Sequence, residues 1–331
     1  MKTILCIGHS TIDIFFEITE ANILHNKNRQ LELCMPFPEK IYIPKREISL
    51  GGNAVNVGVG LLTNKYIVRL VSRTGDDVLG SIIYSNLMEL GFNLDYTSKE
   101  GESDSSVILF HENDRSILSY HGKTPYRFPI EVPYVEWVYL SSLGFDDYQS
   151  LHLPLLDWLA KNPESKLLYN PGENEIKNGF ASVEGIMKRA HTVILNKEEA
   201  HLMINKIRTD HFDYSIKKLL GTYIELGLHN IIITDGENGA YYTSEKNAYY
   251  YIPILEVKVI DSTGAGDAFS SGYLTALIEG VNPPKAVKYG MAQSASCIQE
   301  VGAIHGLQNF EELTIILQQH PEVECEEKFD E

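Results

Sequence analysis

From residue 137 onward, short apolar runs alternate with longer segments of helical pattern, and few folds accommodate such an order. The runs of strand type are 137–140, 166–169 and 192–195, and the helical segments are 148–160, 180–189 and the stretch from 197. This alternation predicts an α/β fold, doubly wound, with a mostly parallel sheet and helices on both faces. In such folds ligands bind at the carboxyl ends of strands, where Asn170 and Asn196 stand in this sequence.

The N-terminal half is predicted to contribute to this sheet and to a second, smaller one. Residues 3–7 and 66–72 have the composition of buried strands. Three further extended stretches are predicted to form a small separate sheet. They are 11–18, 40–48 and a hairpin within 105–120. The polar residues 19–39, which end with Pro36 and Pro38, predict a loop between the first two of these stretches.

The composition indicates a globular protein with a strong negative charge. A chain of 331 residues, 44% of them apolar, is long enough to bury a large core. Its 28 basic and 45 acidic residues give a net charge of −17, which argues against a nucleic acid or a membrane as partner, because phosphate groups are bound mainly by Lys and Arg. Part of the acidic excess lies at the C-terminus. We therefore expect one domain over residues 1–315 and an acidic C-terminal tail over 316–331, of which the last eleven residues are frayed.

The cysteines and the first residues indicate the compartment. Cys6, Cys34, Cys297 and Cys325 are far apart and form no Cys-x-x-Cys pair, which favours a reducing environment over a disulfide framework. The apolar start is too short for the core of a signal peptide, and no apolar run approaches the length of a membrane span. We therefore expect a cytoplasmic protein.

The stretch 261–269, Asp-Ser-Thr-Gly-Ala-Gly-Asp-Ala-Phe, joins an extended segment to a predicted helix. Gly264, Ala265 and Gly266 lack bulk, so their backbone N–H groups can close around an anion at the positive end of that helix. Asp267 follows at a position from which a carboxylate can accept the proton of an attacking hydroxyl. The stretch therefore predicts a catalytic site, and the alternative is an ordinary N-terminal helix cap.

A second motif with paired glycines begins at residue 51. Gly51 and Gly52 allow a ligand to approach the backbone closely. Asn53 and Asn56 offer donors and acceptors to substrate hydroxyls at the mouth of the helix that follows. The alternative is a glycine-rich helix entry with Asn caps.

Asp13 interrupts an apolar stretch of the predicted small sheet. A half-buried carboxylate requires a hydrogen-bond partner, which a polyol substrate can supply through two hydroxyls. The alternative is a solvent-facing position on an alternating strand.

The motifs at 51–62 and 261–269 resemble the two signatures of the PfkB/ribokinase family of carbohydrate kinases and occur in the same order. The resemblance of the chain to this family spans roughly residues 3–310. The resemblance implies a ribokinase-like fold with a small β-sheet lid over the substrate. It implies ATP-dependent phosphorylation of a hydroxymethyl group on a sugar. Asp267 would be the general base, and Asp13 would bind the sugar. Ribokinases usually have Lys where Asn53 stands, so the identity of the sugar remains open.

Two further stretches resemble the nucleotide side of that family. Asn196-Lys197-Glu198-Glu199 is similar to its Asn-x-x-Glu motif, which implies that Asn196 lies near the nucleotide phosphates and that Glu199 acts on hydrated Mg²⁺. Thr234, Gly236 and Gly239 match a Thr-x-Gly-x-x-Gly motif that lines ATP. Without the resemblance, these stretches would be an acidic first turn of a helix and a hairpin turn.

The resemblance also concerns cations and assembly. Asp261 matches the position that supports a monovalent cation, such as K⁺, in members of the family. In several members two lids clasp each other across a homodimer, which makes a lid-mediated dimer the expected assembly. We predict that Arg115, beside the turn of the lid hairpin, is an exposed turn residue and not a substrate ligand.

Other kinase classes are excluded by missing motifs. The sequence has no Gly-x-x-x-x-Gly-Lys-Ser/Thr loop and no combination of His-Arg-Asp with Asp-Phe-Gly, which excludes P-loop kinases and protein kinases. Two alternatives to a sugar kinase remain: a nucleoside kinase of the same family, and a catalytically silent relative that acts as a binding protein.

Overall fold

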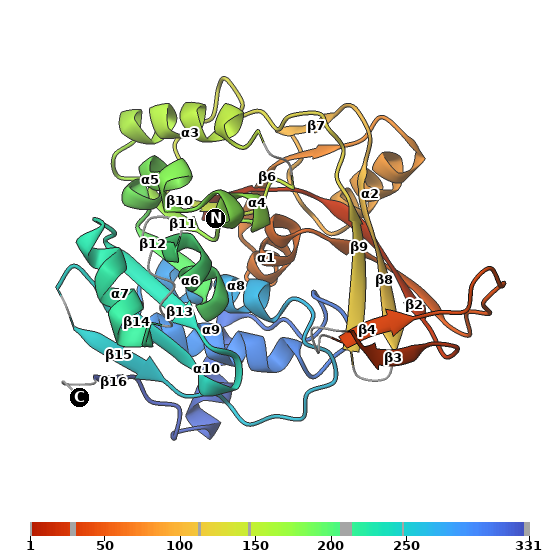
Figure 1. The fold of residues 1–331 in the computed structure, drawn as a ribbon. Coiled ribbons are helices and arrows are strands. Elements are labelled where there is room, and N and C mark those ends of the chain that lie inside the picture. Colours follow the sequence, from red (N-terminus) through yellow and green to blue (C-terminus); the bar gives the residue numbers. More distant parts are fainter. Residues whose placement is uncertain are drawn as a thin grey trace.

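The computed structural model describes residues 2–26, 31–111, 114–144, 147–205, 214–246 and 248–327. Its main element is a ten-stranded sheet (Figure 1). The order across this sheet is β16 (Glu326–Glu327), β15 (Tyr249–Ile252), β14 (Ala240–Ser244), β13 (Asn230–Thr234), β12 (Thr192–Asn196), β11 (Lys166–Tyr169), β10 (Trp137–Leu140), β1 (Thr3–Ile7), β6 (Ile67–Thr74) and β7 (Thr97–Lys99). Neighbours from β13 to β7 are parallel, and the pairs at the other end are antiparallel.

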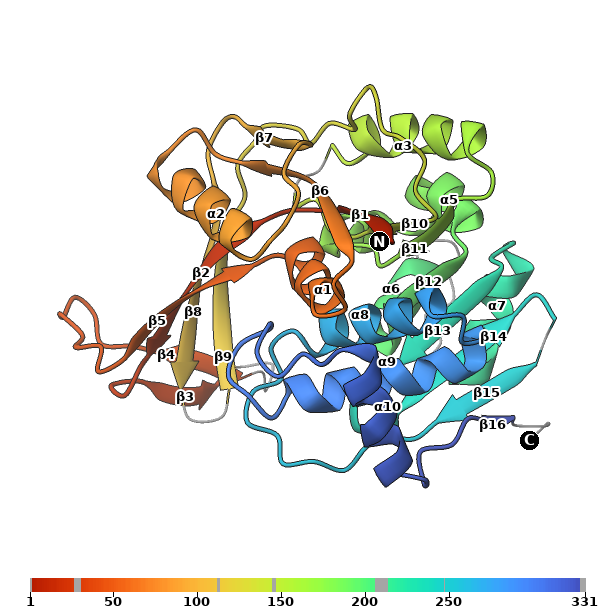
Figure 2. The same cartoon turned by 180° about the vertical axis from the view of Figure 1, so that it is seen from behind.

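Helices cover both faces of the main sheet, as the alternation of strands and helices predicted. They are α1 (Asn53–Leu62), α2 (Val78–Glu89), α3 (Gln149–Lys161), α4 (Glu173–Asn178), α5 (Phe180–Arg189), α6 (Lys197–Asn205), α7 (Ile216–Glu225), α8 (Ala265–Ile278), α9 (Pro283–Cys297) and α10 (Phe310–Gln319). Figure 2 shows α1, α8, α9 and α10 on the side opposite to α6 and α7.

The main sheet has a hydrophobic core on each face, because successive side chains of a strand point to opposite faces. Ile4 and Cys6 of β1 pack into one core with α1, α8 and α9, whereas Leu5 and Ile7 pack into the other with α3, α5 and α6. Because both faces of the parallel strands are buried, most of their residues are apolar and do not alternate with polar residues; β6, which contains Arg69 and Arg73, is the main exception. The predicted fold class is therefore confirmed.

A second, four-stranded sheet stands beside the main sheet (Figures 1 and 2). We call it the lid; its strands, in order, are β5 (Arg46–Gly51), β2 (Thr11–Glu17), β8 (Asp104–His111) and β9 (Asp114–Tyr120). The strand expected over 40–48 begins later, because Pro44 has no N–H to donate to a ladder and β5 starts after it.

Two other segments differ from the expectation. Residues 19–39 were predicted as a loop or a small excursion, and they contain a hairpin of β3 (Asn22–His25) and β4 (Leu31–Cys34), for which no strands were predicted. Residues 316–331 were predicted as an acidic tail with its last eleven residues frayed, but α10 continues to Gln319, Val323 is fully buried, and β16 pairs with β15. A few buried apolar side chains thus pack the described part of this acidic segment against the rest of the fold. Within the described ranges, no helix is long and apolar enough to cross a membrane.

Candidate active site

A cavity of about 230 Å³ lies at the carboxyl ends of β12 and β13, beside the start of α8. It is lined by Asn53, Asn170, Ile194, Asn196, Glu199, Thr234, Ser262, Gly264, Ala265, Gly266, Asp267 and Phe269. The fold therefore brings three stretches that are far apart in sequence, near 53, 196 and 265, to one place. Asn170, which the sequence placed at the carboxyl end of a strand, also lines the cavity and donates a hydrogen bond to the Ile194 carbonyl at 3.0 Å.

The turn before α8 requires glycine at its first small residue. Gly264 has a φ of 76°, in the left-handed region, and a Cβ atom there would lie 2.4 Å from the Cβ of Ala303. A Cβ on Gly266, in contrast, would have no neighbour within 4 Å. The backbone at the positive end of α8 is therefore open to a ligand on the cavity side, which suits the binding of an anion.

Asp267 is buried in the first turn of α8 and is held by two amide donors from α1. Nδ2 of Asn53 donates to Oδ1 at 2.8 Å, and Nδ2 of Asn56 donates to Oδ2 at 2.7 Å. Burial raises the pKa of Asp267 to about 6, although the two amide hydrogen bonds lower it. The carboxyl group is therefore ionised at neutral pH but is more basic than an exposed aspartate.

The two Asn residues thus have a contact that the sequence did not indicate. Asn53 and Asn56 were expected to face substrate hydroxyls, and in this structure their amide groups hold Asp267. Oδ1 of Asn56 is buried without a hydrogen-bond partner in the described part of the chain. No sequence signal joins positions 56 and 267, since the contact arises only when α1 packs against α8.

Asn196 and Glu199 form a reciprocal cap at the junction of β12 and α6. Oδ1 of Asn196 accepts from the Glu199 N–H at 2.8 Å, and Oε2 of Glu199 accepts from the Asn196 N–H at 2.9 Å. Burial raises the pKa of Glu199, the hydrogen bond from the Asn196 backbone lowers it, and the charges of Glu198 and Asp267 raise it further. Both side chains line the cavity, which places carboxylate and carboxamide oxygens there, the ligand types that Mg²⁺ prefers.

The turn after β13 lies next to this cap. Thr234 ends β13 opposite Asn196 in the parallel register and lines the cavity. Gly236 and Gly239 have φ values of 52° and 87°, and a Cβ on Gly239 would lie 2.4 Å from the Ile252 carbonyl oxygen. A Cβ on Gly236 would meet no atom within 4 Å. The structure thus places the three residues of this motif in one tight turn beside the cavity.

Asp13 and the paired glycines meet at the base of the lid. A Cβ on Gly51 would lie 2.1 Å from Oδ2 of Asp13, and Gly52 has a φ of 101°. Burial raises the pKa of Asp13 to about 6, although the Ser106 hydroxyl lowers it. Oδ1 of Asp13 is buried and has no hydrogen-bond partner among the described residues. An acceptor without a donor at this position is suited to a ligand hydroxyl.

Comparison with known proteins identifies the family of this site. The model of the pfkB family carbohydrate kinases matches residues 1–309. The chain belongs to the pfkB family of carbohydrate kinases. The nucleoside kinase of Methanocaldococcus jannaschii is 24% identical over 336 residues, which cover 97% of this chain and 98% of that protein. The fructoselysine 6-kinase of Escherichia coli is 23% identical over 92% of this chain and 100% of its own length.

Solved structures share the fold of this pfkB-family kinase. The crystal structure of the Methanocaldococcus jannaschii nucleoside kinase has a TM-score of 0.74 at 22% identity, and the match covers 97% of this chain and 99% of the other. Arabidopsis thaliana ribokinase, solved with ribose and ATP, has a TM-score of 0.76 at 17% identity and covers 96% of this chain and 98% of its own. The ribokinase-like fold with a separate lid sheet is therefore confirmed.

Asp261 of the kinase lies beside a group of backbone carbonyls. Its Oδ1 accepts from the Thr263 N–H at 2.9 Å and from the Thr263 hydroxyl at 2.7 Å, and its Oδ2 accepts from the Gly302 N–H at 2.9 Å. The carbonyl oxygens of Thr263, Gly302 and Ala303 lie 3.8, 3.9 and 3.6 Å from the Cys297 thiol. Carbonyl and carboxylate oxygens are the kinds of ligand that a monovalent cation would take at this place.

Arg115 corrects one prediction. It was expected to be an exposed turn residue, but its Nη1 lies 3.4 Å from Oδ1 of Asp261 and 3.3 Å from Oγ of Ser262, and only 27% of its side chain is exposed. The lid therefore contacts the loop that leads into α8. The sequence carries no signal for this contact, because it depends on how the lid folds over the main sheet.

A buried ion pair at the base of the lid was also missed. Nη2 of Arg73, at the end of β6, lies 2.8 Å from Oδ1 of Asp104, at the start of β8, and each side chain is 1% exposed. Asp104 also accepts from the Gly122 N–H at 2.9 Å and the Tyr126 hydroxyl at 3.1 Å, and His121 lies 3.3 Å away. This network joins the lid to the main sheet.

Proposed function

We propose that the kinase transfers a phosphoryl group from ATP to a hydroxymethyl group of a sugar or sugar-containing small molecule. The observation that carries the proposal is the buried carboxylate of Asp267, held by Asn53 and Asn56 beside the open backbone of residues 264–266. Asp267 is the general base that accepts the proton of the acceptor hydroxyl. The N–H groups of Gly264, Ala265 and Gly266 stabilise the charge on the transferring group.

On the acceptor side, we propose that Asp13 and the backbone of Gly51 and Gly52 bind the sugar. Asp13 has a buried oxygen that accepts no hydrogen bond in the described part of the chain, and two hydroxyls of the sugar could donate to its carboxylate. The amides of Asn53 and Asn56 hold the base and lie where the acceptor hydroxyl would arrive. On the nucleotide side, Asn196, Thr234, Gly236 and Gly239 contact ATP.

Two cations belong to the proposal. Bound Mg²⁺ neutralises charge on the phosphates of ATP, and Glu199 would hold it through water. Bound K⁺ adds a fixed positive charge beside the anion-binding turn, and Asp261 with the carbonyls of Thr263, Gly302 and Ala303 would hold it. A reducing, cytoplasmic location suits the four free cysteines.

A nucleoside acceptor is the second candidate, and the match to the Methanocaldococcus jannaschii nucleoside kinase over nearly the full length of both chains favours it. The experiment is ATP-dependent ADP release with pentoses, hexoses, keto-deoxy acids and nucleosides, with and without K⁺. Turnover with one acceptor class supports the proposal and names the class. ATP binding without turnover of any acceptor would instead support a binding protein.

The pH dependence of the reaction tests the base. Since the carboxylate is the active form, kcat/KM should fall as the pH drops below about 6, the pKa of Asp267. The amide of Asn56 lowers this pKa, so Asn56→Ala should move the acid limb of the profile to higher pH. Asn86→Ala on α2 is the control and should leave the profile in place. An unchanged acid limb in Asn56→Ala would contradict the assignment.

Glu199 is tested by the affinity for Mg²⁺. Glu199→Gln removes the carboxylate charge, and we expect about tenfold weaker Mg²⁺-dependent ATP binding in calorimetry, a loss of about 1.4 kcal/mol. Glu198→Gln, the exposed neighbour on the same helix turn, is the matched control. Equal Mg²⁺ affinity in the two variants would remove Glu199 from the metal site.

We propose a homodimer through the outer face of the lid. One row of apolar residues crosses all four lid strands in register: Ile48, Ile14, Val107 and Leu118. Ile48 is 50% and Leu118 is 59% exposed in the single chain. Leu118→Glu should therefore convert a dimer to a monomer in sedimentation, whereas Ile315→Glu on α10 should not. A wild-type monomer at micromolar concentration would refute this assembly.

A further inference from the structure

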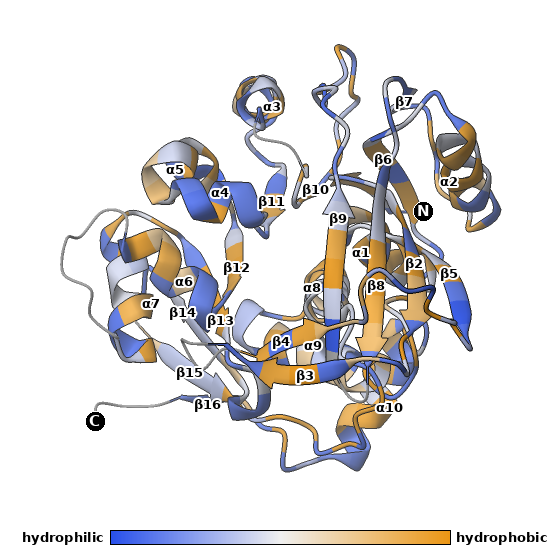
Figure 3. Ribbon diagram, turned by 45° about the vertical axis from the view of Figure 1, so that its right-hand side comes forward, coloured by the Kyte–Doolittle hydropathy of each residue, from blue (hydrophilic) through white to orange (hydrophobic). Residues whose placement is uncertain are grey.

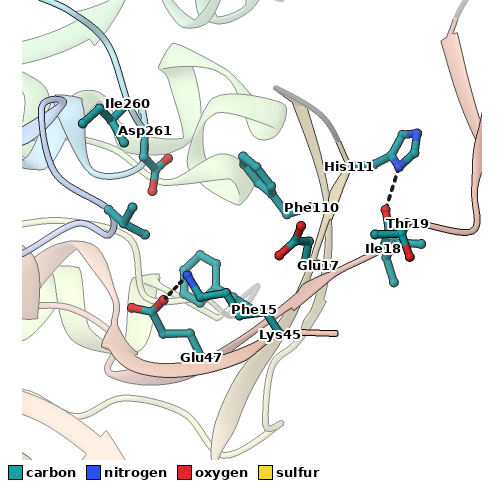
Figure 4. Close-up of a pocket in the computed structure, with 11 residues that line it drawn as sticks. Phe15, Glu17, Ile18, Thr19, Lys45, Glu47, Phe110, His111, Ile260 and Asp261 are labelled. Atoms are coloured by element: carbon teal, nitrogen blue, oxygen red, sulfur yellow. Dashed lines mark hydrogen bonds and ion pairs between the residues drawn. The ribbon is translucent and has the colours of Figure 1, made fainter. Parts of the chain in front are cut away.

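A second, larger cavity lies between the lid and the loops that precede α8 and follow α9. Its volume is about 590 Å³, within the range that holds drug-sized ligands. It is lined by Phe15, Glu17, Ile18, Thr19, Lys45, Glu47, Phe110, His111, Ile260, Asp261 and Val301. Figure 4 shows the side chains of the lid on one side of this space and Ile260 and Asp261 on the other.

The cavity continues the lid face that carries Asp13. Successive strand residues point to opposite faces, so Asp13, Phe15 and Glu17 share one face of β2. Phe15 is in register with Glu47 on β5, and Glu17 is in register with Phe110 on β8. A ligand held by Asp13 at the base of the lid would therefore extend along the strand toward Phe15 and Glu17.

The opposite wall connects this cavity with the one around Asp267. Arg115 contacts both Asp261, which lines the larger cavity, and Ser262, which lines the smaller one. The two cavities therefore lie close together at the consecutive residues Asp261 and Ser262, which Arg115 contacts. A sugar whose hydroxymethyl group reaches Asp267 has room beyond it for a substituent.

The walls combine apolar surface with uncompensated negative charge. Phe15, Ile18, Phe110, Ile260 and Val301 give the space an apolar lining. The charged side chains of the lining are those of Glu17, Glu47, Asp261 and Lys45. Lys45 lies 3.6 Å from Glu47, and Arg115 from outside the lining pairs with Asp261.

Glu17 is the charge that remains. It is exposed to solvent at the rim of the cavity and forms no ion pair with any residue in the part of the chain that the structure describes, and its carboxylate stands beside Phe110 (Figure 4). A protonated amine at the end of an apolar chain would complement this lining, because the chain covers the aromatic side chains and the amine pairs with the carboxylate.

We infer that the acceptor is a sugar carrying an apolar substituent that ends in a protonated amine, with the substituent in the larger cavity and the amine on Glu17. The inference rests on the proposed function, because it takes the acceptor sugar to lie between Asp13 and Asp267. It makes Phe15, Glu17 and Phe110 residues that determine specificity.

The test uses matched synthetic acceptors on two sugars: free fructose and ribose, their hexyl glycosides and their 6-aminohexyl glycosides. Binding is measured by calorimetry in the presence of ADP, so that no turnover is needed. On at least one of the sugars, we expect the aminohexyl glycoside to bind about threefold to fivefold more tightly than the hexyl glycoside and the free sugar, the gain typical of a pair with an exposed carboxylate. Glu17→Gln should abolish the difference between the two glycosides, and Glu164→Gln, exposed and distant from the lid, should keep it.

Three outcomes would overturn the inference: free sugars that bind as tightly as the aminohexyl glycosides, an amine preference that survives Glu17→Gln, or adenosine that binds more tightly than aminohexyl riboside. The proposed function is tested separately, by ATP turnover with the same compounds. Tight binding of aminohexyl glycosides without phosphorylation would refute the transfer reaction and leave the cavity assignment. Phosphorylation of free sugars without any amine preference would support the transfer reaction and refute the cavity assignment.

Discussion

Asp267→Asn is expected to lower kcat about a thousandfold, within the range that removal of a general base produces. An amide cannot accept the proton of the acceptor hydroxyl, while the anion-binding turn and the nucleotide contacts remain. The rate should therefore fall with little change in the affinity for ATP. The measurement is steady-state ADP release with whichever acceptor of the panel is turned over, beside calorimetry of ATP binding. A variant within tenfold of the wild-type rate would show that another group accepts the proton.

The same substitution should leave the fold intact and stabilise it at high pH. Because burial raises the pKa of Asp267 from 3.8 to about 6, the group favours the folded state at low pH and this contribution is lost as the pH rises through 6. Removing the carboxylate should then add about 2–3 kcal/mol to the free energy of unfolding at pH 8. Rotation of the Asn56 amide would bring its unpartnered Oδ1 to the new amide. Denaturant unfolding at pH 5 and pH 8 checks the pH dependence.

Asp104→Ala is expected to reduce the free energy of unfolding by about 3–5 kcal/mol, the loss typical when one partner of a buried ion pair is removed. Arg73 would keep its charge, 1% exposed, without the carboxylate 2.8 Å away. Tyr126 and the Gly122 N–H would lose their acceptor as well. Because Asp104 begins β8, the lid should loosen and the KM for the acceptor should rise. Urea unfolding and acceptor kinetics measure the two effects.

A double-mutant cycle separates the pair from its surroundings. Arg73→Met combined with Asp104→Leu should cost less than the two single substitutions together, because no buried charge is left alone. Burial raises the pKa of Asp104, but hydrogen bonds from His121 and Gly122 and the charges of His9 and Arg73 bring it below the ordinary value. The stability that this carboxylate contributes is therefore present above pH 4 and is lost at lower pH. A single variant within 1 kcal/mol of wild type would contradict the role of the pair.

The sequence predicted best the elements that are buried on all sides. The strands at 137–140 and 166–169 were predicted with their observed bounds, because a strand buried between two layers of helices forms a nearly continuous apolar run. The β3–β4 hairpin was missed for the opposite reason: all four residues of β3 are exposed, so no core selects an alternating pattern there. The segment 40–48 was extended toward the N-terminus because Ile41 and Ile43 resemble strand residues, although Pro44 separates them from the ladder.

In the candidate site, local chemistry was predictable and long-range pairing was not. The glycine turn before Asp267 and the Asn196–Glu199 cap follow from residues within a few positions of each other. The contact between Asn56 and Asp267 joins positions 211 apart, and that between Arg115 and Asp261 joins positions 146 apart. Such contacts depend on helix packing and on closure of the lid, which a single sequence does not encode in any periodic pattern.

The separate lid sheet has a consequence for engineering the kinase. Its strands hydrogen-bond to one another and not to the ten-stranded sheet, while the base and the anion-binding turn belong to α8 (Figure 3). A mutant library restricted to the inward-facing positions 15, 17, 47 and 110 would therefore vary the acceptor pocket without altering the transfer chemistry. Positions 15 and 47, and positions 17 and 110, are cross-strand neighbours, so each pair should be varied together. Directed evolution of acceptor range should accordingly select paired lid substitutions, provided that the Arg73–Asp104 anchor is retained.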